Sequence, residues 1–205
     1  MIIYDQFFKC VLHIIKKDHN DIKIYQNMSK PFLHVIDKIF TEVECHKIIE
    51  VIENKDHWEH VDRGIAEYER LILIDKPLAN YLFSKIKHVL PDHFKGMKII
   101  GLNDHFRFSK YFPGGSFGIH RDGINTDNKG NRAVMTLNIF LNVPEEGGGT
   151  IFYDNSGKQV IRNVRPKSGT GALFYNQIYH EGELVKKGFK YLIRTDVMVS
   201  IHPII

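Results

Sequence analysis

The sequence predicts an α+β protein in which two N-terminal helices pack on an antiparallel β-barrel or sandwich. Apolar residues recur at helical spacing in residues 41–54 and 75–90. From about Met97 the pattern changes to short alternating or β-branched runs separated by Gly, Pro and Asn. We therefore expect an N-terminal helical support region, residues 1–96, and a β domain, residues 97–205, that together form one structural unit.

The composition is that of an ordinary globular protein. The 205 residues include 28 Lys+Arg, 24 Asp+Glu and 7 Pro, and 43% are apolar, which excludes disordered and collagen-like chains. A single core at this length buries roughly 70% of the surface that the unfolded chain exposes. Two cysteines, Cys10 and Cys45, cannot form a disulfide framework. We expect a reducing compartment and a small core residue at Cys45.

The sequence predicts neither a targeting segment nor a membrane or nucleic-acid partner. The apolar N-terminal stretch is interrupted by Asp5 and Lys9 and has no small-residue cleavage site, so we expect no signal peptide. No run approaches the ~20 apolar residues of a membrane helix. The net charge of +4 comes from scattered residues, without a basic stripe. We expect an intracellular, cytoplasmic protein with no membrane or nucleic-acid partner.

Both predicted helices have sequence signals at their ends. Thr41 and Glu44 form a capping box before the first apolar stripe, which runs to about residue 54. The second helix begins at Asp75 with Pro77 in its first turn, and Pro91 ends it. These are expected to be packing elements.

The remainder of the chain is expected to be largely strand. Residues 61–74 indicate an irregular connection followed by a short strand, RLILI. The strands predicted in the C-terminal half are 105–112, 117–122, 133–142, 149–153, 159–165, 171–176 and 190–199.

The longer strands each have one apolar and one partly polar face, because alternate side chains of a strand share a face. The polar faces include Arg107, Ser109, Tyr111, Thr136, Asn138, Lys190, Arg194 and Asp196. Such a face can simply be solvated. Alternatively, it lines the inside of a barrel, where the basic residues would require an anion or acidic side chains. Arg194 would then contact a ligand or pair with a carboxylate such as Asp196, and Asn138 would line the pocket or bond to a neighbour.

One short motif is a candidate metal site. His120 and Asp122 lie at i and i+2, which places both on one face of a strand, whereas Arg121 between them must point away. His180 is the candidate third ligand. Two histidines and one carboxylate form the facial triad that suits non-haem Fe(II), because it leaves coordination positions open. The other histidines, such as His57, His60 and His105, are expected to be structural or at the surface.

An ordered set of motifs surrounds these residues. It consists of Tyr111 nine residues before His120, then His120-x-Asp122, Arg132 to Leu141, Glu145-Glu146-Gly147-Gly148-Gly149-Thr150, His180-Glu181-Gly182 and Gly188-Phe189-Lys190-Tyr191. In this order the stretch from about Arg107 to Val199 resembles the catalytic domain of Fe(II)- and 2-oxoglutarate-dependent oxygenases of the prolyl 4-hydroxylase-like family. The resemblance covers roughly the C-terminal half of the chain.

The resemblance implies a fold and a role for each matching residue. It implies a double-stranded β-helix (jelly-roll) barrel in residues 97–205, with the N-terminal helices packed on its major sheet. His120, Asp122 and His180 match the catalytic metal ligands. Lys190 matches the residue that pairs with the far carboxylate of 2-oxoglutarate, as suits an ammonium with three donors. Tyr111 and Thr136 match its hydroxyl partners.

The implied activity is that of a dioxygenase, resembling procollagen-proline 4-dioxygenases, that uses Fe(II), 2-oxoglutarate and O2 and releases succinate and CO2. A peptidyl proline is the favoured substrate, and residues 123–132 are expected to form a mobile substrate loop. A free amino acid, another protein side chain or a small metabolite remains an alternative, as does a catalytically silent barrel that binds a peptide or anion. An extended groove would favour a peptide and a closed pocket a metabolite. Residues 1–30, the oligomeric state and a requirement for ascorbate are left open.

Overall fold

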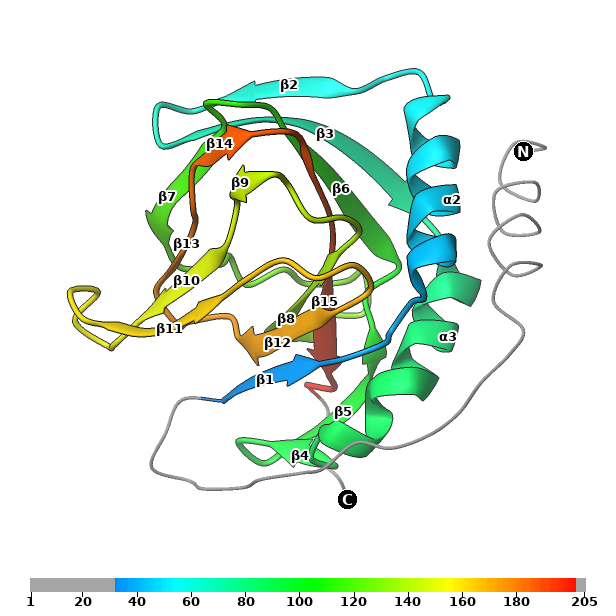
Figure 1. Cartoon of the computed structure of the whole chain (residues 1–205). Coiled ribbons are helices and arrows are strands. Elements are labelled where there is room, and N and C mark those ends of the chain that lie inside the picture. Colours follow the sequence, from blue (N-terminus) through cyan, green and yellow to red (C-terminus); the bar gives the residue numbers. More distant parts are fainter. Residues whose placement is uncertain (1–31, 202–205) are drawn as a thin grey trace.

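The computed structural model describes residues 32–201, in which a strongly curved sheet forms a nearly closed barrel with helices on its outside (Figure 1). Within these residues the two α-helices are α2 (Glu42–Glu53) and α3 (Lys76–Ile86), the latter continued by a 3-10 turn, η1 (Lys87–Val89). The first strands are β1 (Leu33–Ile36), β2 (Glu59–Asp62), β3 (Ala66–Ile74), β4 (His93–Phe94), β5 (Met97–Leu102), β6 (His105–Tyr111) and β7 (Ser116–His120). They are followed by β8 (Arg132–Phe140), β9 (Glu146–Gly147), β10 (Thr150–Tyr153), β11 (Val160–Val164), β12 (Gly171–Tyr175), β13 (His180–Gly182), β14 (Val185–Lys187) and β15 (Lys190–Val199).

The order of the strands brings distant parts of the chain together. Neighbouring strands follow the order β1-β12-β8-β15-β6-β3-β7-β13-β10-β11, and all the pairs are antiparallel. The long strand β15 lies between β8 and β6 and forms the centre of one wall, while β7, β13 and β10 belong to the opposite wall (Figure 1). The predicted α+β barrel is confirmed.

The main core lies between the helices and the apolar faces of this central wall. Its buried members come from both helices and from the faces predicted to be apolar: Cys45, Ile48, Ile52, Leu78, Leu82, Ile86, Phe106, Phe108, Met135, Leu137, Ile139, Ile193, Val197 and Val199. Burial of each such side chain is worth roughly 1.5–3 kcal/mol. The alternation in the sequence therefore predicted correctly which face of each strand contacts the helices.

Both helices begin where the sequence predicts. The Glu44 N–H donates to Thr41 Oγ1 at 3.2 Å, and the Thr41 N–H donates to the Glu44 carboxylate at 2.6 Å, which completes the capping box. The Asp75 carboxylate accepts from the Leu78 N–H at 2.8 Å. The sequence predicts that the second helix runs to residue 90. In the structure α3 ends at Ile86, and the 3-10 turn η1 continues it to Val89.

The N-terminal region contains more strand than the sequence predicted, although the predicted short strand RLILI is confirmed as the second half of β3. Residues 59–74 form the hairpin β2–β3, and β3 pairs with both β6 and β7, whereas β1 pairs with β12. Glu67 and Glu69 weakened the strand pattern of this segment, but pairing with β6 and β7 supplies the backbone partners that the local sequence cannot reveal. The region before residue 97 thus contributes strands to the barrel as well as helices. The apolar segment within residues 1–30 lies outside the described residues, and within those residues no helix is long and apolar enough to span a membrane.

A tight backbone contact joins the start of the helical layer to the barrel. The Gly169 carbonyl accepts from the Ile39 and Phe40 N–H groups at 2.9 and 3.3 Å. Gly169 has a φ of +74°, and a Cβ at this position would overlap the Phe40 carbonyl oxygen. A side chain therefore cannot be accommodated without separating the two layers.

We expect Gly169→Ala to lower the free energy of unfolding by the strain of a positive φ, about 1–2 kcal/mol, plus about 1–3 kcal/mol for displacing the backbone. Gly64→Ala is the matched control, because Gly64 has the same φ of +74° but nothing within 4 Å of the added Cβ. Urea unfolding of both variants measures the difference. Equal losses of stability would contradict the role assigned to the Gly169 contact.

Candidate active site

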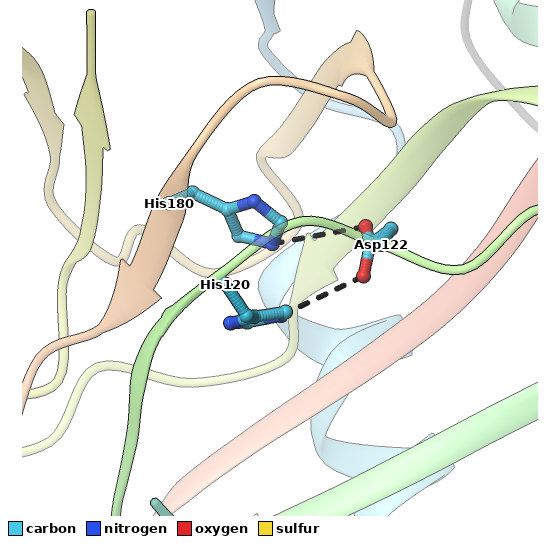
Figure 2. A group of neighbouring side chains, drawn as sticks. All are labelled: His120, Asp122 and His180. Carbon is cyan, nitrogen blue, oxygen red and sulfur yellow. Dashed lines mark ion pairs between the residues drawn. The ribbon is translucent and has the colours of Figure 1, made fainter. Parts of the chain in front are cut away.

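Two neighbouring strands bring the predicted metal ligands together. His120 ends β7, His180 begins β13, and the two residues are direct partners in the antiparallel pair. Asp122 follows β7, so the strand ends two residues earlier than predicted, and its N–H donates to the Asn176 carbonyl at 2.9 Å. Ligand atoms of the three side chains all lie within 4.8 Å of one another, and Figure 2 shows them converging. This set of atoms can hold a metal ion.

Backbone carbonyls orient both imidazole rings. His120 Nδ1 lies 2.8 Å from the Gly118 carbonyl oxygen, and His180 Nδ1 lies 3.0 Å from that of Ile178. These contacts direct the Nε2 atoms towards Asp122, at 3.6 Å from Oδ1 for His120 and 3.7 Å from Oδ2 for His180 (Figure 2). Burial lowers the pKa of His180 to about 4, so its imidazole is neutral near pH 7. Neutral, oriented imidazoles are the form that binds metal ions.

The Asp122 carboxylate is buried but held in its charged form. Burial alone would raise its pKa, but the Arg194 guanidinium, the two imidazoles and a hydrogen bond from Thr136 hold it well below the usual range. Arg194 Nη2 lies 3.1 Å from Oδ1, and Thr136 Oγ1 donates to Oδ2 at 2.5 Å. The structure therefore places the Thr136 hydroxyl on a candidate metal ligand. Its predicted contact with 2-oxoglutarate stays a prediction.

Removing the Thr136 hydroxyl is expected to weaken metal binding. Thr136→Val leaves Asp122 without this donor, and loss of such a supporting hydrogen bond typically costs roughly 10–100-fold in metal affinity. Thr195→Val is the matched control, because the Thr195 hydroxyl is also buried but donates to the Asn103 carbonyl at 2.7 Å, away from the site. Equilibrium titration with Mn(II) measures both. Unchanged affinity in Thr136→Val would show that the hydroxyl does not support the ligand.

The three residues open onto a pocket inside the barrel, with an empty volume of about 540 Å³ including its mouth. Most of the predicted polar faces point into it, so these faces are not simply solvated. The lining consists of Tyr68, Arg107, Ser109, Tyr111, Phe117, His120, Asp122, Asn138, Thr150, His180, Gly182, Lys190, Leu192 and Arg194.

Lys190 is a buried cation in this pocket. It is only 2% exposed, its ammonium contacts the Gly149 carbonyl oxygen at 3.5 Å, and it lies 5.1 Å from the centre of the Tyr111 ring. Within residues 32–201 no carboxylate lies at ion-pair distance from it, and burial lowers its pKa to about 8. A buried charge is costly without a counter-charge, so this environment fits an incoming carboxylate.

Tyr111 is buried next to Lys190, and burial raises the pKa of its phenol well above the usual value. Its ring stacks on Tyr68 at a centroid distance of 5.0 Å, and Tyr68 in turn faces Phe117, which stacks on His120 at 3.8 Å. An aromatic wall thus connects the candidate metal site with Lys190.

A sequence profile of the family described as "Poxvirus C4/C10 protein" matches residues 36–205. The chain belongs to this family. The match includes His120, Asp122, His180 and Lys190, so the pocket lies within the matched part of the chain. No curated protein matches the chain.

Solved structures identify the fold of this C4/C10 family member. A viral collagen prolyl hydroxylase from Paramecium bursaria Chlorella virus-1, in complex with 2-oxoglutarate, is 20% identical with a TM-score of 0.61, covering 84% of this chain and 98% of its own. A Pseudomonas putida prolyl-4-hydroxylase is 16% identical (TM-score 0.62; 83% and 94% covered). A Trichoplax adhaerens prolyl hydroxylase, in complex with a hypoxia-inducible-factor peptide, is 14% identical (TM-score 0.65; 83% and 84% covered). The fold is the double-stranded β-helix of prolyl 4-hydroxylase-like 2-oxoglutarate oxygenases, as the sequence resemblance implied.

The structure also decides several residues that the sequence left open. Arg194 pairs with Asp196 at 3.3 Å in addition to Asp122. Arg121 is exposed and stacks on Tyr179, with its Cζ 4.0 Å from the ring centre, so it points away from the site as predicted. His57, His60 and His105 are exposed, also as predicted.

The pocket residues that sequence analysis missed come mainly from the hairpin and from small or apolar positions. Tyr68 lies on β3, in the segment interpreted as an irregular connection, and Phe117 and Thr150 carry no charge that marks them as functional. The alternation of Ala66 and Tyr68 was the available signal, because both are buried on the inner side of β3.

Proposed function

We propose that this protein is an Fe(II)- and 2-oxoglutarate-dependent dioxygenase that hydroxylates an unactivated carbon. The observation that carries the proposal is the combination, in one pocket, of a two-histidine, one-carboxylate group and a buried lysine that has no carboxylate at ion-pair distance among the described residues. His120, Asp122 and His180 would hold Fe(II) and leave positions open for other ligands. When bound, the iron supplies the oxidative chemistry that couples decarboxylation of 2-oxoglutarate with hydroxylation of the substrate, releasing succinate and CO2.

The protein's own residues would bind, orient and shield the reactants. Lys190 would donate to the far carboxylate of 2-oxoglutarate, and the adjacent Tyr111 hydroxyl would donate a second hydrogen bond. The aromatic wall formed by Tyr68, Tyr111 and Phe117 would exclude water from the cosubstrate. A zinc hydrolase would use similar ligands, but it would have no role for the buried Lys190.

A peptidyl proline is the proposed substrate class that the fold favours, since the three solved structures described above are prolyl hydroxylases and one of them holds a peptide. Residues 123–132 follow His120 and Asp122 in the chain and reach into the barrel, because Asn125 Nδ2 donates to the Asp196 carboxylate at 2.7 Å. This connection supports a substrate-contacting role for the segment. A free amino acid, another protein side chain or a small metabolite is the alternative substrate.

Succinate formation tests the activity. Anaerobically purified protein is given Fe(II), 2-oxoglutarate and O2, with and without a library of proline-containing peptides, and products are analysed by mass spectrometry. Peptide-stimulated succinate with a product 16 Da heavier is the expected result. Turnover that no peptide stimulates would keep the oxygenase and replace the substrate class. Absence of turnover in protein shown to bind iron would instead indicate a silent binding barrel.

A further inference from the structure

A second polar group lies in the pocket on the side of Asp122. Arg107 on β6, Arg194 on β15 and Asn138 on β8 are direct partners across three neighbouring strands, and all three line the pocket. We call these residues the polar row. Lys190 is four residues from Arg194 along β15, which corresponds to roughly 13 Å at ~3.3 Å per residue. The polar row is therefore separate from the lysine to which we assign the cosubstrate.

Two atoms of the polar row are buried without a hydrogen-bond partner. Asn138 is only 6% exposed, and its Oδ1 accepts no hydrogen bond from any described residue. Arg194 Nε likewise has no acceptor. Leaving a buried polar atom without a hydrogen bond is destabilising, so both atoms favour a ligand that forms the missing hydrogen bonds. That ligand must offer an acceptor to Arg194 and a donor to Asn138.

The charges of the row are also incompletely balanced. Asp196 is fully buried and faces both guanidinium groups, at 3.4 Å from Arg107 and 3.3 Å from Arg194. The second carboxylate near Arg194 is Asp122, whose charge would be committed to a bound metal ion. One carboxylate, Asp196, then remains for two guanidinium groups. Fe(II) and the Lys190 ammonium together balance Asp122 and dianionic 2-oxoglutarate, which leaves this excess positive charge for the remaining reactant.

We propose that the polar row binds a substrate carboxylate together with the N–H group next to it. Arg107 and Arg194 would donate to the carboxylate, as guanidinium groups commonly do, and Asn138 Oδ1 would accept from the N–H. The chemical unit that carries both groups is an α-amino acid with a free carboxylate, either as the free molecule or as the C-terminal residue of a peptide. The inference rests on the proposed function, because it places this unit beside the candidate metal ligands.

Binding in the absence of O2 tests the inference without catalysis. Protein loaded with Mn(II) and 2-oxoglutarate is titrated by calorimetry with free amino acids, including L-proline, and with proline-containing tripeptides ending in a carboxylate or in an amide. We expect the tripeptide acid, the free amino acid or both to bind at least tenfold more tightly than the tripeptide amide. Whichever of the two acids binds shows whether the carboxylate belongs to a peptide or to a free amino acid. Equal affinities of acid and amide, or no saturable binding of any carboxylate, would overturn the inference.

Variants locate the preference on the polar row. Arg107→Met removes a charge and should reduce the ratio of acid to amide affinities at least tenfold. Asn138→Leu removes the acceptor of the N–H group at similar volume without changing charge, so it should weaken binding of the carboxylate ligand itself at least tenfold. Arg162→Met is the matched control, because Arg162 is exposed on β11 and its loss changes the net charge equally. An unchanged affinity for the carboxylate ligand in folded Asn138→Leu would exclude the proposed contact.

The same samples separate this inference from the proposed function. Calorimetric binding of 2-oxoglutarate to the Mn(II)-loaded protein reports on the metal and Lys190. If 2-oxoglutarate binds but acids and amides do not differ, only the polar-row inference fails. If 2-oxoglutarate does not bind, the proposed function fails whatever the carboxylate preference.

Discussion

Replacing His180 with alanine is expected to abolish both metal binding and 2-oxoglutarate turnover. His180 is buried, and its Nε2 faces Asp122 at 3.7 Å. Among the described residues the candidate metal group has only His120 and Asp122 besides His180, so no further side chain replaces the lost ligand. Loss of a direct ligand should weaken metal binding by more than the roughly 10–100-fold caused by losing a supporting hydrogen bond. Asp122→Ala should have the same effect. Anaerobic Fe(II) titration and succinate formation measure the two losses.

His105→Ala is the matched control for this experiment. His105 lies on β6 but is exposed and outside the pocket, so its loss tests whether removing any histidine affects metal binding. Metal affinity and turnover close to those of the unmodified protein are expected for this variant. Wild-type turnover in purified His180→Ala or Asp122→Ala would refute the assignment of the three ligands.

Replacing Lys190 with methionine should separate cosubstrate binding from metal binding. Methionine preserves much of the buried volume but removes the cation that we assign to the far carboxylate of 2-oxoglutarate. Truncating one partner of a buried charge pair costs about 2–5 kcal/mol, which corresponds to at least roughly a 30-fold increase in the dissociation constant for 2-oxoglutarate. Metal affinity should be retained. A variant that binds 2-oxoglutarate normally would exclude Lys190 as the anchor.

The pH dependence of 2-oxoglutarate binding provides an independent measurement on Lys190. Burial lowers the pKa of Lys190 to about 8 in the free protein, and the protonated form is the one that attracts a carboxylate. Affinity should be constant below about pH 8 and fall roughly tenfold per pH unit above it, and this dependence should disappear in Lys190→Met. In the unfolded chain Lys190 keeps its proton up to about pH 10.4. Its contribution to the free energy of unfolding of the unliganded protein should therefore rise with pH between about 8 and 10.4.

The elements that the sequence predicted correctly have local causes. The capping box of α2 and the Asp75 cap of α3 involve residues three apart, so a short segment determines each helix start. Alternation placed Phe106 in the core and Arg107 in the pocket, because neighbouring residues of a strand always face opposite sides. The ordered motifs identified His120, Asp122, His180 and Lys190 as site candidates, and the structure places all four around one pocket.

The sequence by itself thus determined the helix starts, the two faces of the long strands and the candidate metal ligands. Tertiary structure alone decided which strands are neighbours: β3 beside β6 and β7, and His180 opposite His120. The inward position of Tyr68, the Thr136 hydrogen bond to Asp122 and the placement of Asp196 between two arginines all follow from that pairing. The physical reason is that alternation is a property of each strand, whereas pairing depends on backbone hydrogen bonds and packing between segments distant in the chain.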